Sequence, residues 1–182
     1  MPLVLASRCL RASLPERVAG SDLVPILAGL SASKGYKLFL LGGEPDALRL
    51  ACARMEERWP GVRIAGALSP TFAPVTRMDN EGILAEIEKA EPDILLVAFG
   101  NPKQEKWIRD NLAASGVGLA MGIGGSLDVI SGRIKRAPVW MQKHGLEWVY
   151  RLLKDPSKIS KVSSLPRYLW MILKAKLGAG KG

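Results

Sequence analysis

Residues 95–108 read LLVAFGNPKQEKWI, and the character of the chain changes sharply inside this stretch. The apolar run at 95–99 is typical of a strand that is buried on both faces. The run ends in Gly-Asn-Pro at 100–102, and three polar residues, Lys-Gln-Glu, follow at once at 103–105. The stretch therefore predicts a buried strand whose carboxyl end delivers polar side chains to the start of a helix.

The same alternation of strand and helix extends through the middle of the chain. Runs of aliphatic residues predict strands at 37–41, 62–68, 94–99 and 119–123. Between them, helical patterns span 45–59, 80–90 and 104–114. Asn80 is expected to cap the second of these helices, and Ser21 to cap a helix that precedes the first strand. The pattern predicts an α/β fold: a Rossmann-like domain over residues 1–138, with a parallel sheet and helices on both faces.

The end of the chain has a different composition. Two helical apolar stripes, around 146–153 and 166–177, stand among basic residues. Residues 1–132 hold 14 Lys/Arg and 15 Asp/Glu, whereas residues 133–182 hold 12 Lys/Arg and 2 Asp/Glu. All of the net charge of +9 therefore comes from the last part of the chain. We expect a basic amphipathic helical appendage at 139–182 whose partner is anionic: phosphate, a lipid surface or nucleic acid.

Several classes of protein are disfavoured. No apolar run approaches the roughly 18–20 residues that span a bilayer. Two cysteines, Cys9 and Cys52, are too few for a disulfide framework or a thiolate metal site, and His144 is the single histidine. The chain also lacks a Walker motif, G-x-G-x-x-G, G-x-S-x-G and D-x-D. A nucleotide diphosphate would therefore be held by cationic side chains and helix N-termini, with no metal and no cofactor.

Three glycine-containing turns follow the predicted strands, and they are Gly42-Gly43, Gly100-Asn101-Pro102-Lys103 and Gly124-Gly125. The carboxyl ends of parallel strands meet at one edge of a sheet, where open α/β proteins bind ligands. Glycine lets the backbone approach a phosphate closely, although each pair taken alone is also compatible with an ordinary turn. Together the three turns predict one binding site.

Several polar residues near these turns could either bind a ligand or have an ordinary structural or surface role. Gln104 could orient a sugar hydroxyl or a reacting oxygen, or be a solvated residue at a helix start. Lys103 could neutralise phosphate or lie on the surface, and Glu105 suits a helix N-terminus by its charge. Asp128 could accept from a nucleobase N–H or be a helix-end carboxylate. Arg17 could pair with a neighbouring carboxylate or reach a diphosphate.

Four segments together resemble the WecG/TagA/CpsF glycosyltransferases, family 26: LPERVAGSDL, LFLLGGEPD, ILLVAFGNPKQEKWI and GIGGSLDVISGRIKRAPVWMQKHGLEWVYRLLKDP. The similarity runs in order from Met1 to about Lys161. It implies a cytoplasmic, metal-independent, inverting transferase at the inner face of the plasma membrane. Such enzymes move a sugar, often N-acetylmannosamine from its UDP donor, onto a polyprenyl-diphosphate-linked sugar. Their products feed teichoic acid, enterobacterial common antigen or exopolysaccharide.

The resemblance also implies roles for particular positions. Arg17 and Gln104 match family residues that line the active-site pocket, and both are expected to be catalytic. Asp128 and the Thr71-Phe72 loop match positions near the uracil.

The C-terminal appendage has its own correspondence. Arg151, Lys158 and Lys161 match basic residues of a family appendage thought to reach the diphosphate and the membrane.

One feature departs from the family. Members carry an N-terminal segment that ends in Asp-Gly just before the equivalent of residues 1–4, and its aspartate is the proposed catalytic base. We expect this base, and the first strand or two of the sheet, to lie upstream of Met1.

Alternatives to the full transferase stay open. A fragment that binds nucleotide without catalysis fits the same residues, as does a transferase of glucose or glucuronate. A nucleic-acid partner is disfavoured, because Trp140, Trp148 and Trp170 stand among aliphatic residues at helical spacing. A homo-oligomer is compatible with the sequence.

Overall fold

The computed structural model describes residues 20–71 and 73–135, together with 137–138, 141, 149–150, 153, 170–171 and 174. The chain forms two compact units, one of Val18–Lys135 and the other of Met1–Arg17 with Arg136–Gly182. All strands and helices with bounds given below belong to the first unit. The domain boundary after residue 138 stays a prediction.

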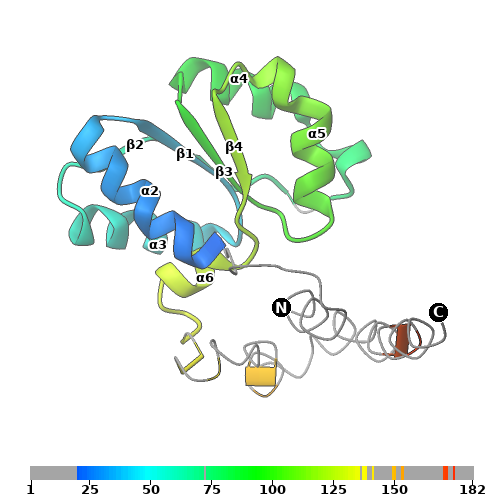
Figure 1. The fold of residues 1–182 in the computed structure, drawn as a ribbon. Coiled ribbons are helices and arrows are strands. Elements are labelled where there is room, and N and C mark those ends of the chain that lie inside the picture. The colour runs from blue at the N-terminus through cyan, green and yellow to red at the C-terminus, as the bar shows by residue number, and fades with distance from the viewer. Residues whose placement is uncertain are drawn as a thin grey trace, which may run out of the picture. The chain divides into compact units, whose positions relative to one another are not determined.

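Within the described residues, four parallel strands form one sheet in the order β2-β1-β3-β4 (Figure 1). Their bounds are β1 Lys37–Gly42, β2 Arg63–Leu68, β3 Ile94–Ala98 and β4 Leu119–Gly122. β1 pairs with β3 without interruption, from Leu38 opposite Ile94 to Gly42 opposite Ala98. The predicted strands and their parallel arrangement are confirmed, with each end within one residue of its expected position.

Helices cover both faces of this sheet. Figure 1 shows α2, α3 and α6 on one side, and α4 and α5 on the other. The bounds are α2 Gly20–Lys34, α3 Pro45–Arg58, α4 Asn80–Ala90, α5 Lys103–Ser115 and α6 Ser126–Ile130, with a 3-10 turn, η1, at Val75–Arg77. This arrangement confirms the predicted α/β fold with helices on both faces.

The alternation of side chains along β1 builds the two halves of the core. Leu38 and Leu40 pack into the apolar cluster formed with α2, α3 and α6. Phe39 and Leu41 pack into the cluster formed with α4 and α5. On β2, a Cβ at Gly66 would lie 2.5 Å from the Phe39 ring, so the glycine makes room for this large side chain. Burial on both faces explains why the central strands are continuous apolar runs.

Two helix starts differ from those expected. Asp79, and not Asn80, is the N-cap of α4, and its side chain accepts a 2.9 Å hydrogen bond from Gly82 N–H. Asn80 lies one residue further along, inside the helix. Ser21 likewise lies inside α2, which includes Gly20. Adjacent polar residues are equally able to cap a helix, and the backbone path decides which one does.

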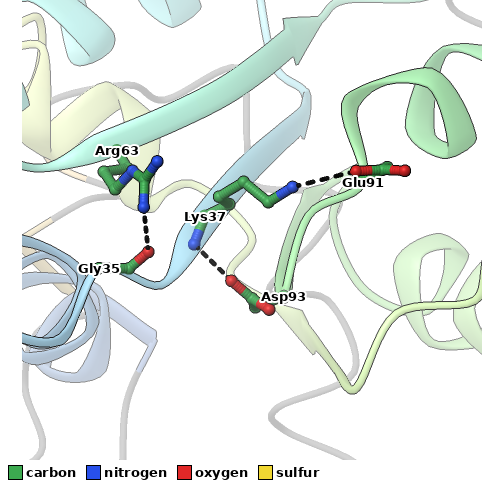
Figure 2. A network of polar contacts seen from close by, with 5 residues as sticks. All are labelled: Gly35, Lys37, Arg63, Glu91 and Asp93. Atoms are coloured by element: carbon green, nitrogen blue, oxygen red, sulfur yellow. Dashed lines mark hydrogen bonds and ion pairs between the residues drawn. The ribbon is translucent and has the colours of Figure 1, made fainter.

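The amino ends of β1 and β3 are tied together by polar contacts (Figure 2). The backbone N–H of Lys37 donates to Asp93 Oδ2 at 2.7 Å, and the N–H of Asp93 donates to the Lys37 carbonyl at 2.9 Å. Lys37 Nζ lies 3.5 Å from a carboxylate oxygen of Glu91. Arg63 Nη1 donates to the Gly35 carbonyl at 3.3 Å. These contacts stabilise the register at the edge opposite the candidate site.

Ser31 provides a buried link at the same edge. Its hydroxyl donates to the Tyr36 carbonyl at 2.6 Å and accepts from Arg63 N–H at 2.9 Å. The Ser31 side chain is fully buried, so one hydroxyl joins α2, the turn before β1 and the start of β2.

Ser31→Ala should lower the free energy of unfolding by about 1–3 kcal/mol, because it leaves two backbone groups without their partner. Ser33→Ala is the matched control, since its exposed hydroxyl bonds within the same helix, to the Gly29 carbonyl at 2.9 Å. The control should cost less than about 0.5 kcal/mol. Urea unfolding followed by circular dichroism measures both, and equal losses would contradict the prediction.

Candidate functional site

The candidate site residues stand at the carboxyl ends of the strands. After β1 the chain continues into α3, on one face of the sheet, and after β3 into α5, on the other face. β1 and β3 are neighbours, so their carboxyl ends form a topological switch point. Ligands of open α/β sheets bind at such points.

The glycine pair at the end of β1 lies close to the segments that follow the other strands. Gly42 has a φ of +97°, and a Cβ there would lie 2.7 Å from the Phe99 ring, after β3. Gly43 has a φ of +81°, and a Cβ there would lie 3.1 Å from Leu127, in α6. The Gly43 carbonyl accepts a 2.6 Å hydrogen bond from the Ser69 hydroxyl, after β2. The structure therefore brings the strand-end turns together, as the sequence predicts.

The turn after β3 is sharp. Gly100 has a φ of +79°, the Asn101-Pro102 peptide bond is cis, and α5 begins at the next residue. Asn101 is exposed. Lys103 Nζ lies 5.1 Å from the centroid of the Phe99 ring, and partial burial lowers the pKa of Lys103. An ammonium over an aromatic face is attracted to the ring.

Gln104 points inward and is 5% exposed. Its Oε1 accepts from the N–H of Gly100 at 3.1 Å and from the N–H of Gly124 at 2.9 Å. Its Nε2 donates to Glu105 Oε1 at 3.0 Å. The side chain thus joins the turn after β3 to the turn after β4, and it is not a solvated residue.

The turn after β4 leads into the short helix α6. Gly124 has a φ of +51°, and Gly125 is the N-cap of α6. Asp128 lies in the first turn of this helix and is half-buried. Within the described part of the chain, its carboxylate makes no hydrogen bond or ion pair.

The segment after β2 is held by two residues that sequence analysis missed as part of the site. Trp107, fully buried in α5, donates from Nε1 to Asn80 Oδ1 at 2.8 Å. Asn80 Nδ2 donates to the Val75 carbonyl at 3.1 Å and so holds η1. A tryptophan on the buried face of a helix is the available sequence signal, because its indole N–H needs an acceptor. Thr71, in the same segment, is exposed.

Other predicted site residues lie outside the described residues, namely Arg17, Phe72, Arg151, Lys158 and Lys161. Across the described ranges, no group of three or more His, Cys, Asp or Glu side chains could hold a metal ion.

Gly42→Ala should destabilise the domain more than Gly100→Ala. Both positions have positive φ, which costs an alanine about 1–2 kcal/mol. Only at Gly42 does the added Cβ also meet the Phe99 ring, because the space around Gly100 is open within 4 Å. The additional loss of unfolding free energy, about 1–3 kcal/mol, is measured by urea unfolding. Equal losses would show that the contact with Phe99 relaxes freely.

The sequence of this chain is similar to those of a known protein family. The whole chain, residues 1–182, matches the family described as glycosyl transferase WecG/TagA/CpsF. It is 34% identical over 172 residues to the N-acetylglucosaminyldiphosphoundecaprenol N-acetyl-beta-D-mannosaminyltransferase of Bacillus subtilis (strain 168). The match covers 94% of this chain and 65% of that relative, so the chain spans somewhat less than two-thirds of the relative's length. The chain therefore belongs to the WecG/TagA/CpsF family of glycosyltransferases.

Proposed function

We propose that this chain binds a UDP-sugar at the switch point between β1 and β3 and transfers the sugar to a polyprenyl-diphosphate-linked acceptor. N-acetylmannosamine is the sugar that we favour, because the Bacillus subtilis relative is named as an N-acetylmannosaminyltransferase. The observation that carries the proposal is the contact of Gly42 and Gly43 with the turns after β2, β3 and β4. These contacts support the proposal because they bring segments that follow all four strands close together.

The chemistry requires a base and a stabilised leaving group. In an inverting transfer, the acceptor hydroxyl attacks C1 of the sugar, the bond from C1 to the diphosphate breaks, and the hydroxyl proton passes to a carboxylate. We propose that an aspartate is this base, as the family resemblance implies. UDP leaves with its diphosphate charge, which needs cationic or dipolar partners.

The described residues supply part of that stabilisation in our proposal. α5 begins beside the turn after β3, and Lys103 stands at its first position. A helix N-terminus attracts anions, and Lys103 adds a positive charge there. Arg17 and Arg151 are proposed as further cations on the diphosphate. Asp128 and Thr71 are proposed to contact the uracil.

UDP should bind equally well with and without a divalent metal, because side chains and a helix N-terminus replace the metal clamp. Calorimetric titration in EDTA and in MgCl2 measures the difference, with GDP as the control nucleotide. A tenfold loss of affinity in EDTA, about 1.4 kcal/mol, would contradict metal-independent binding. A titration series of UDP- and GDP-sugars would then separate N-acetylmannosamine from glucose and glucuronate.

The C-terminal appendage is proposed to hold the protein on the inner face of the plasma membrane. Leu153, Trp170 and Met171 are 74%, 60% and 56% exposed. Lys174 Nζ lies 5.3 Å from the Trp170 ring, which places a positive charge beside an exposed aromatic. Exposed apolar residues among basic ones favour attachment to an anionic lipid surface. Among the described residues, no helix is long and apolar enough to cross a membrane.

Deletion from Ser163 onward should abolish flotation with anionic liposomes and leave the sheet domain folded. Each Lys or Arg near an anionic surface contributes about 1 kcal/mol to attachment, so wild-type flotation should weaken with salt. Neutral liposomes and an oligonucleotide at matched salt are the controls. Unchanged flotation of the deletion variant, or tighter binding to the oligonucleotide, would contradict membrane attachment through this segment.

A further inference from the structure

We propose that Gln104 is a positioning residue, which fixes the backbone of Gly100 and Gly124, and that Glu105 orients its amide. The proposal rests on the proposed function, because the two turns that Gln104 joins flank the switch point where UDP is to bind. In this role Gln104 does not contact the sugar. It acts on the ligand through the backbone of Gly100 and Gly124.

The hydrogen bonds determine which way the amide faces. Two backbone N–H groups, those of Gly100 and Gly124, lie 3.1 Å and 2.9 Å from one atom of the Gln104 side chain. Because N–H groups only donate, that atom has to be the carbonyl oxygen, and the amide nitrogen has to face the other way. There it donates to Glu105 Oε1 at 3.0 Å. An ionised carboxylate can accept hydrogen bonds but cannot donate them. Every contact therefore agrees with one orientation.

The bonding capacity of Gln104 Oε1 is filled by these contacts. A carbonyl oxygen has two lone pairs, and here each receives one backbone N–H. No acceptor capacity remains for a sugar hydroxyl. The N–H groups of Gly100 and Gly124 are also occupied, so neither is directed at a phosphate.

Gly122 provides the space that this arrangement needs. A Cβ on Gly122 would lie 2.5 Å from Gln104 Nε2 and 2.8 Å from its Cδ. Gly122 is not among the positive-φ residues, so its backbone tolerates alanine. The absence of a side chain at Gly122 therefore leaves the space that the Gln104 side chain occupies.

Gln104→Met removes the acceptor and keeps the approximate volume. In the 182-residue chain, hydrogen exchange of the Gly100 and Gly124 amides, followed by NMR, should become about tenfold faster or more. UDP affinity, measured by calorimetry on the same samples, should fall by about tenfold. Asn111→Leu is the matched control, because its buried amide bonds inside α5, to the Trp107 carbonyl at 2.9 Å. The control should leave both amides and the UDP affinity unchanged.

A charge swap separates positioning from ligand contact. Gln104→Glu alone sets two carboxylates against each other and should weaken the protection of both amides. In the double variant Gln104→Glu/Glu105→Gln, the carboxylate accepts from both glycines and the new amide donates to it. Protection and UDP affinity should both return to within about twofold of wild type, a difference of under 0.5 kcal/mol.

Two results would overturn the proposal. Unchanged exchange of both amides in Gln104→Met would show that Gln104 does not hold the turns. In the double variant, wild-type protection of both amides together with a UDP affinity still as low as in Gln104→Met would show that the Gln104 amide contacts the ligand directly. If wild type binds no UDP, the proposed function fails, and amide exchange still decides the positioning role. If Gln104→Met does not fold, Gly122→Ala displaces the same side chain and takes its place in the test.

Discussion

The parallel pairing of β1 with β3 is the contact on which the rest of the structure depends. Both strands are buried on both faces, because helices pack against each side of the sheet. A shift of β1 by one residue in this pairing would exchange the two faces of β1, placing Phe39 where Leu38 or Leu40 packs. The pairing also makes β1 and β3 neighbours, although α3, after β1, and α5, after β3, pack on opposite faces of the sheet. The position of the candidate site follows from that single contact.

The sheet could be predicted from sequence because its signals are local. Residues 38–41 and 94–99 are continuous apolar runs that are each followed by a glycine, and both segments form central strands. Helix caps could not be assigned in this way, because adjacent polar residues have the same capping chemistry. Asp79 and Asn80 are chemically alike as caps, and the hydrogen bonds from Trp107 and to Val75 engage the asparagine elsewhere.

The inward orientation of Gln104 could not be predicted in the same way. A first-turn residue of a helix can face solvent, a ligand or a neighbouring turn, and its sequence position is the same in each case. The partners that decide, Gly122 and Gly124, are distant in sequence, and they adjoin Gln104 because β4 lies next to β3. Periodicity within a segment carries no information on such a contact. The membership of the family, in contrast, was indicated by four segments together, one of which contains PKQE, and confirmed by the match to the whole chain.

Trp107 links two loops that are well separated along the chain. Its ring packs edge-on against Phe99, with centroids 5.8 Å apart, and its Nε1 holds Asn80. Asn80 in turn holds Val75, so displacement of the segment after β2 either breaks the indole hydrogen bond or carries α5 with it. The coupling between the two loops is therefore limited to the free energy of these hydrogen bonds, about 0.5–1.5 kcal/mol each. A ligand that favours one conformation of either loop shifts the conformation of the other by no more than this amount.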